Sequence, residues 1–168
     1  TALPDIQQAA WIQQARAGGT VNGSIVFPNG TSGIELGPTE ITGNVVLNGS
    51  NSLTITGPLY IHGNLVISQN TTITQDPSFG NTFSTIIVDG TIDIDNNVNF
   101  VGNGSGAGSG AFLLVSNAAA QTGDDAAIEI SNDNSDLGDV VLFAQEGDVH
   151  INSNRVILAV YAAHGTAT

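Results

Sequence analysis

The chain has 168 residues, with 15 acidic side chains, two arginines and no lysine, so that its formal net charge is −13. This charge argues against nucleic acid and anionic lipid as partners, because both need cationic side chains to neutralise phosphate. The absence of cysteine excludes disulfides, thiolate metal sites and a cysteine nucleophile. No apolar run approaches the roughly 20 residues that cross a bilayer, so we expect one domain that does not insert into a membrane.

Residues 1–19 contain the one segment with helical character, which we predict over Leu3–Ala17. Pro4 suits a first helical turn, and the Gly18–Gly19 pair ends the helix. Helical spacing places Ile6, Ala9, Ala10 and Gln13 on one side, with Trp11 and Ile12 beside them. Because the helix is short and rich in glutamine, it would be marginal alone. We therefore expect it to cap an open apolar end of the domain, with Trp11 buried.

From residue 20 onward the sequence shows short apolar–polar alternations bounded by Gly, Asn, Ser or Pro, which predict strands. The predicted strands are Ile34–Leu36, Val45–Leu47, Leu53–Ile55, Leu59–Ile61, Leu65–Ile67, Thr85–Val88, Ala111–Val115, Ala127–Ile130 and Val140–Phe143. Asn-Gly pairs between some of them could form hairpins. A repeated frame favours a different arrangement.

The frame has Gly, apolar residues two and four positions later, and Asn seven positions later. Its copies begin at Gly63, Gly90 and Gly147, with a looser copy at Gly43. Asn tolerates the left-handed backbone that a corner between stacked strands demands, and periods of 20–50 residues indicate repeat architectures. We predict an all-β fold, a single-stranded parallel β-helix (β-solenoid) of right-handed coil over residues 20–168. The N-terminal capping α-helix lies within residues 1–19.

The last predicted strand, Arg155–Tyr161, is long and apolar, and no helical pattern follows it. An uncovered strand edge pairs with other chains. We therefore expect a homo-oligomer, or contact with neighbouring domains of a longer surface protein. The residues predicted to mediate this self-association are Trp11, Val156, Leu158, Val160 and Tyr161.

Several pieces in order carry a resemblance that covers nearly the whole chain. They are Ala17–Gly19, Leu36–Pro38, Ile41–Asn44, Leu53–Gly57, Ile86–Ile92 and Val140–Asn154. With them the sequence resembles β-solenoid ectodomains of uncharacterised bacterial cell-surface proteins, some of them pilus-associated through a pilin-like N-terminal segment. The hydrophobic pilin-type helix is missing here. A weaker similarity is to bactofilins, cytoskeletal β-helices that polymerise end to end. The resemblance implies an extracellular structural protein and transfers no catalytic residues.

An acidic stretch over residues 131–139 is the best candidate for a bound ion, because Ca²⁺ prefers hard oxygen ligands. Asp133, Asp136 and Asp139 are the predicted calcium ligands. The stretch does not match EF-hand spacing, and the alternative is an acidic loop that faces water. We predict no other cofactor.

Catalytic patterns are poorly represented. A lyase on a parallel β-helix needs a cationic base, which a chain with two arginines and no lysine supplies poorly. A glycan hydrolase needs paired carboxylates, for which Asp89, Asp93 and Asp95 are candidates, although alternating polar residues that face water are the favoured explanation. We therefore predict that the protein is not an enzyme.

The sequence thus favours a non-enzymatic extracellular structural module, a rigid building block of a surface appendage or filament that assembles end to end. The alternative is an adhesin or carbohydrate-binding module on a bacterial surface protein. Such a module would bind its ligand along an outer face near Tyr60, Asp93 and His150.

Overall fold

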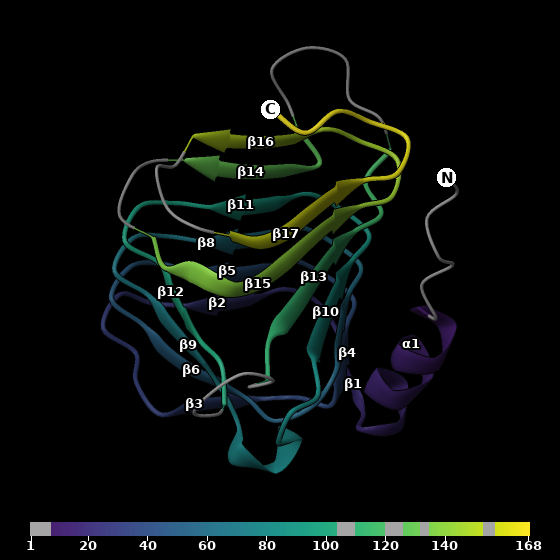
Figure 1. The fold of residues 1–168 in the computed structure, drawn as a ribbon. Helices are drawn as coiled ribbons and strands as arrows, with labels where there is room; N and C mark the ends of the chain where they lie inside the picture. Colours follow the sequence, from purple (N-terminus) through teal and green to yellow (C-terminus); the bar gives the residue numbers. More distant parts are fainter. Residues whose placement is uncertain (1–7, 104–109, 120–125, 132–134, 153–156) are drawn as a thin grey trace.

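A computed structural model describes residues 8–103, 110–119, 126–131, 135–152 and 157–168. The protein is mostly β-structure, with one short α-helix and three parallel sheets (Figure 1). The predicted all-β class with an N-terminal helix is confirmed. Within the described ranges, no helix has the length and apolar character needed to cross a membrane.

The strands are shared among three sheets, here called A, B and C. Sheet A contains β1 (Thr20–Val21), β4 (Thr39–Ile41), β7 (Leu59–Ile61), β10 (Ser84–Val88), β13 (Phe112–Ser116), β15 (Leu137–Ala144) and β17 (Ile157–Ala162). Sheet B contains β2 (Ile25–Phe27), β5 (Val45–Leu47), β8 (Leu65–Ile67), β11 (Ile92–Ile94), β14 (Ile128–Ser131) and β16 (Val149–Asn152). Sheet C contains β3 (Ile34–Leu36), β6 (Ser52–Ile55), β9 (Thr72–Gln75) and β12 (Asn99–Val101). A 3₁₀ turn, η1 (Pro77–Phe79), lies between β9 and β10.

From β1 to β12 the chain passes through sheets A, B and C in turn, and we call one such passage a circuit. Each strand pairs in parallel with the strand one circuit later, as β4 does with β7, β5 with β8 and β6 with β9. Every strand pair formed by the described residues is parallel. The Asn-Gly pairs therefore do not form hairpins there, and all ten predicted strands, Arg155–Tyr161 included, overlap observed ones.

The core lies inside the three sheets and is built from apolar columns in register. Val45, Leu65 and Ile92 form one such column across β5, β8 and β11, and each is at most 3% exposed. The residues between them along each strand point outward, as half-buried Val66 does. Burying one such aliphatic side chain contributes about 1.5–3 kcal/mol, so that the in-register columns are the main source of stability.

The glycine of the repeated frame occupies the corner between sheets A and B. The Gly63 N–H donates to the Gly43 carbonyl and the Gly90 N–H donates to the Gly63 carbonyl, each at 3.1 Å. The Asn44 Oδ1 atom accepts the Asn64 N–H at 2.9 Å, so that side-chain amides continue the ladder beside the glycines. Successive corners approach so closely that a Cβ on Gly63 would overlap Asn44 Oδ1 and lie 2.8 Å from the Asn44 backbone nitrogen.

The asparagine of the frame occupies the next corner, between sheets B and C. Ser50, Asn70 and Asn97 have positive φ angles of 38°, 59° and 58°, the left-handed conformation that Asn tolerates better than most residues. The Asn97 Nδ2 donates to Asn70 Oδ1 at 3.2 Å. The predicted corner role of Asn is confirmed at these positions, and Asn154 lies outside the described residues.

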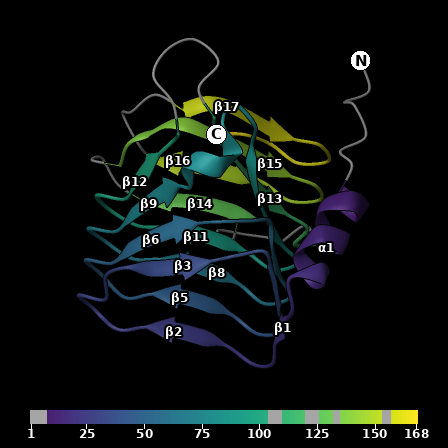
Figure 2. The same cartoon turned by 90° about the horizontal axis from the view of Figure 1, so that it is seen from below.

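The helix α1 (Gln8–Ala17) lies along the outer face of sheet A, where it contacts β4, β7 and β10 (Figure 2). The prediction that it caps an open end is therefore wrong. Its first residue, Gln8, accepts a hydrogen bond from Asn117 Nδ2 at 3.0 Å, whereas Arg16 in its last turn reaches Glu40 on β4. The helix thus runs against the direction in which the circuits are added.

The physical reason for this position is an apolar column on the outer face of sheet A. Tyr60, Ile87, Val115 and Phe143 occupy aligned positions on β7, β10, β13 and β15. All four are at most 8% exposed, and Trp11 is packed against their cluster. An outward apolar column needs a cover on that face, and α1 supplies it.

We expect Gly63→Ala to destabilise the protein by about 1–3 kcal/mol, the usual cost of overpacking. The matched control is Gly138→Ala, because the nearest atom to its added Cβ would be 3.5 Å away. Urea denaturation followed by circular dichroism measures both. Equal stability of the two variants would contradict the proposed close approach at the corner.

Candidate functional site

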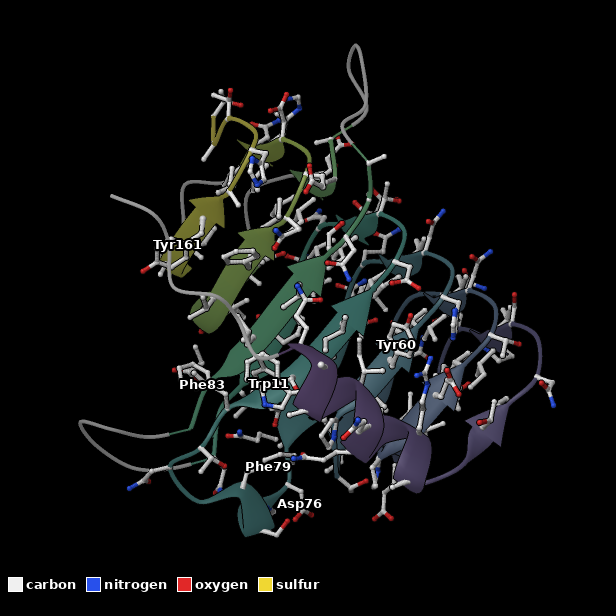
Figure 3. All side chains as sticks on the ribbon, turned by 90° about the vertical axis from the view of Figure 1, so that its right-hand side faces the viewer. Trp11, Tyr60, Asp76, Phe79, Phe83 and Tyr161 are labelled. Atoms are coloured by element: carbon white, nitrogen blue, oxygen red, sulfur yellow. The ribbon has the colours of Figure 1, made fainter. Side chains whose placement is uncertain are left out.

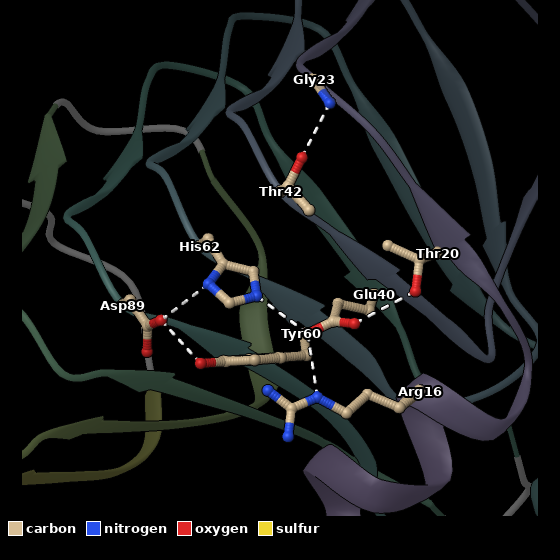
Figure 4. A network of polar contacts seen from close by, with 8 residues as sticks. All are labelled: Arg16, Thr20, Gly23, Glu40, Thr42, Tyr60, His62 and Asp89. Atoms are coloured by element: carbon tan, nitrogen blue, oxygen red, sulfur yellow. Dashed lines mark hydrogen bonds and ion pairs between the residues drawn. The ribbon is translucent and has the colours of Figure 1, made fainter.

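A network of polar side chains lies on the outer face of sheet A, at the C-terminal end of α1 (Figure 4). Glu40 is at its centre, and its side chain is 12% exposed. The Arg16 Nε donates to Glu40 Oε1 at 2.9 Å, and the Thr20 hydroxyl donates to Oε2 at 3.1 Å. The His62 Nε2 lies 2.9 Å from Oε1. Parallel register places Thr20, Glu40 and Tyr60 side by side on β1, β4 and β7.

Tyr60 and Asp89 continue the cluster toward the next strand. The Tyr60 hydroxyl donates to Asp89 Oδ2 at 2.7 Å, and His62 Nδ1 lies 3.5 Å from the same oxygen. The Arg16 guanidinium carbon is 5.4 Å from the centre of the Tyr60 ring, within the range of a cation–π contact. The histidine therefore stands between two carboxylates, and the arginine of the helix rests on the tyrosine of the sheet.

These contacts fix the ionisation of two members. Hydrogen bonds from His62 and then from Arg16 lower the pKa of Glu40 to about 2. Burial, followed by the hydrogen bond to Asp89, raises the pKa of Tyr60 to about 12. At neutral pH Glu40 is ionised and Tyr60 is protonated, far from the pKa near 7 that suits a general acid or base. The arrangement attaches α1 to sheet A.

A shallow polar groove of about 430 Å³ opens near the corner between sheets A and B. Its lining includes Asn64, Asp89, Asp93 and Glu129, and no aromatic residue of the described chain. Asp93 and Glu129 are neighbours on β11 and β14, and His150 follows Glu129 in register on β16. Carboxylate and amide oxygens in this arrangement suit a cation or a ligand rich in hydroxyl groups.

The structure separates the residues of the predicted outer-face binding site. Asp93 and His150 share one column of sheet B, but Tyr60 belongs to sheet A and is 8% exposed beneath α1. Tyr60 is therefore unavailable to a ligand on that face. Of the three candidate catalytic carboxylates, Asp89 and Asp93 line the groove, whereas the Asp95 Oδ1 accepts the Asn96 N–H at 2.8 Å and is not among the lining residues.

Two of the predicted calcium ligands hold backbone in place. The Asp136 Oδ1 accepts the Gly138 N–H at 3.2 Å, and the Asp139 Oδ2 accepts the Gly102 N–H at 3.0 Å. Asp133 lies outside the described residues. In the part of the chain that the structure describes, no three His, Asp or Glu side chains are placed to hold a metal. The calcium site stays a prediction.

Of the predicted self-association residues, the structure describes the side chains of Trp11, Val160 and Tyr161, and these three do not share one surface (Figure 3 shows Trp11 and Tyr161). Trp11 packs half-buried on the outer face of sheet A, and Tyr161 lies farther along that face on β17, 42% exposed, with its ring centre 6.3 Å from that of Phe143. Val160 packs partly buried against the core inside the sheets. Val156 and the side chain of Leu158 lie outside what the structure describes.

The cluster around Glu40 was missed at the level of sequence, although a signal for it exists. Glu40 and Tyr60 each stand three positions before the glycine of their frame, and His62 and Asp89 each stand one position before theirs. Equivalent positions in a stacked repeat become neighbours. Aligning the frames on their glycines therefore predicts that these side chains meet.

No protein-family model matches the chain, and neither the curated proteins nor the solved structures contain a significant match. The resemblance to bacterial surface ectodomains therefore stays a prediction. The function has to be argued from the geometry and the charge of the described residues.

The depressed pKa of Glu40 predicts a specific acid sensitivity. Because its folded pKa is about 2 and its usual value is 4.5, the stabilisation is fully present above pH 4.5 and is lost as pH falls toward 2. We expect Glu40→Gln to be less stable than the parent at pH 7 and to lose less stability between pH 4.5 and 2. Glu35→Gln, on the outer face of β3, is the control. Parallel acid-denaturation curves for parent and Glu40→Gln would refute the assignment.

Proposed function

We propose that this chain is a non-enzymatic structural module, a rigid building block of an extracellular appendage or filament that associates through its ends. The observation that carries the proposal is the uniform parallel pairing of successive circuits, which leaves the outer edges of β1, β2 and β3 at one end and of β17 at the other without a described partner strand. Strand edges without a partner recruit other chains. The partners are then other copies of this chain or neighbouring domains of a longer surface protein.

We infer that sheets A, B and C are the faces of a single-stranded parallel β-solenoid. The visit to the three sheets in turn supports this architecture, and the strong preference of parallel crossovers for one hand favours a right-handed coil. Backbone ladders along one axis and interior apolar columns resist bending. A module of this kind serves as a spacer or a filament subunit.

The polar chemistry also favours a structural role. The main cluster keeps Glu40 ionised and Tyr60 protonated, and its groups are occupied in joining α1 to sheet A. The surface relies on Asn, Ser and Thr more than on charge, since charged residues make up only 10% of the chain. Such a surface suits an extracellular setting, where salt and pH vary.

Carbohydrate recognition is the second candidate function, and the groove beside Asp93 is the observation that favours it. Its carboxylates and the Asn64 amide supply acceptors and donors for sugar hydroxyls. The chain would then be an adhesin module that presents this groove on a rigid stack.

Assembly is tested by negative-stain electron microscopy and sedimentation velocity at rising protein concentration, with and without Ca²⁺. We expect rods that lengthen with concentration. We expect the double substitution Val156→Lys and Leu158→Lys to preserve the circular dichroism spectrum and to abolish association through the β17 end. Monomers at every concentration would refute the structural proposal. Rods that need Ca²⁺ would support the acidic stretch as a metal site.

The adhesin alternative is tested on a glycan array with the parent, Glu129→Gln and the control Glu35→Gln. We expect any specific glycan signal to fall at least tenfold in Glu129→Gln and to be unchanged in the control. An array without hits, or hits indifferent to Glu129→Gln, would remove this alternative.

A further inference from the structure

The first circuit, formed by β1, β2 and β3, has an unpaired outer edge. Each of these strands is the terminal strand of its sheet, and no described strand lies beyond them. On β2, the Ile25 N–H donates to the Asn44 carbonyl and the Phe27 carbonyl accepts the Asn48 N–H, at 2.8 and 3.0 Å. Backbone groups alternate in direction along a strand, so those of Val26 point away from β5 and are free for another chain.

The interior of the first circuit also lacks one layer of side chains. Its inward residues are half-buried and are Ile25, Phe27, Ile34 and Leu36. Their register partners in the next circuit are at most 3% exposed and are Val45, Leu47, Leu53 and Ile55. Equivalent residues of the two circuits thus differ in exposure because no described residue covers the outer side of the first circuit. An apolar layer placed there would complete the column.

The helix leaves this end open. It contacts β4, β7 and β10 along the side of the stack and begins at Gln8, beside Asn117. Figure 2 shows β1, β2 and β3 at one end of the stack with α1 lying alongside. The described residues of this chain therefore leave the first circuit uncovered.

Charge favours a second first circuit as the cover of this end. Glu35 is the only charged residue between 18 and 37, whereas 12 of the 15 acidic residues follow Gly57. Two first circuits therefore meet with less like-charge repulsion than any pairing that involves the acidic later circuits. The edge carries no lysine, although lysine on edge strands is a common means of preventing pairing with other chains.

The opposite end of the stack is a poorer match for the first circuit. Its edge in sheet B is already occupied, because Ala167 forms a parallel bridge with Val149 and the Thr168 carbonyl accepts the Ile151 N–H at 2.8 Å. Sheet C has its last described strand at β12, before the last strands of sheets A and B. A first circuit placed at that end would therefore meet free strand edges opposite only some of its three strands.

We propose that the first circuits of two copies of this chain dock on each other in an isologous, two-fold contact. Such a contact uses the same patch on both partners and turns the two incomplete apolar layers into interior. The inference deepens the proposed function, on which it rests, by assigning one of the association surfaces to β1, β2 and β3. The first circuit thereby becomes a second association surface, in addition to the end of the stack around β17.

Single cysteines test the contact directly, because the parent chain has none. A two-fold axis across a three-sided end maps one strand onto its own copy. At least one of Thr20→Cys, Val26→Cys and Glu35→Cys, the outward positions of β1, β2 and β3, should therefore give a covalent dimer with a short bis-maleimide. The control Val101→Cys, on β12 and 45% exposed, should stay monomeric on a denaturing gel.

A charge substitution supplies the second measurement. The Val26 side chain is 55% exposed, so Val26→Lys should fold normally and weaken dimerisation at least tenfold in sedimentation equilibrium, with Val101→Lys unchanged. Cross-links that form only when a first-circuit cysteine is mixed with Tyr161→Cys would overturn the two-fold contact. Absence of any first-circuit cross-link in a parent that assembles would overturn it too, while the proposed structural function stands. Dimers that never grow into rods would support the contact and refute the filament.

Discussion

The in-register stacking of parallel strands is the constraint on which the rest of the structure depends. Side chains alternate between the two sides of a strand, so a slip of one residue would turn a buried column toward water. The columns through Val45 and Leu65 hold the register, and the glycines at the A–B corner allow successive circuits to approach within hydrogen-bonding distance. Irregular segments between strands leave this register unchanged, and η1 is an example. It begins after Asp76, whose side chain accepts the Ser78 N–H at 2.9 Å.

Much of this could be predicted from the sequence, because alternation and corner residues are local signals. These local signals predict the strands, the glycine corner and the left-handed positions at Asn70 and Asn97. The position of α1 could not be predicted in the same way. It depends on a column through Ile87 and Val115 on the outer face, and that column exists only once circuits of unequal length are aligned. The near-continuous apolar run in β10 did carry a hint, since strands covered on both faces read that way.

The candidate site was predicted less well for the same reason. Asp93 and His150 were correctly grouped on one face, but Tyr60 was not, because its hydroxyl and ring are committed to Asp89 and Arg16. Single residues on outward positions look alike in sequence. The spacings of 20 and 27 residues between frames decide which of these side chains meet. The side chains come into contact only once the circuits are stacked in register.

The direction of α1 has a consequence for the order of folding. The helix precedes every strand in the chain, yet its docking surface comes from later circuits, and the contact between Gln8 and Asn117 spans 109 residues. A ten-residue helix is marginal in water, so during synthesis it stays unpacked until β4, β7 and β10 have formed. Contacts so distant in sequence form slowly. The docking of α1 therefore closes the folding of the central circuits, and a segment made before every described strand is among the last to find its place.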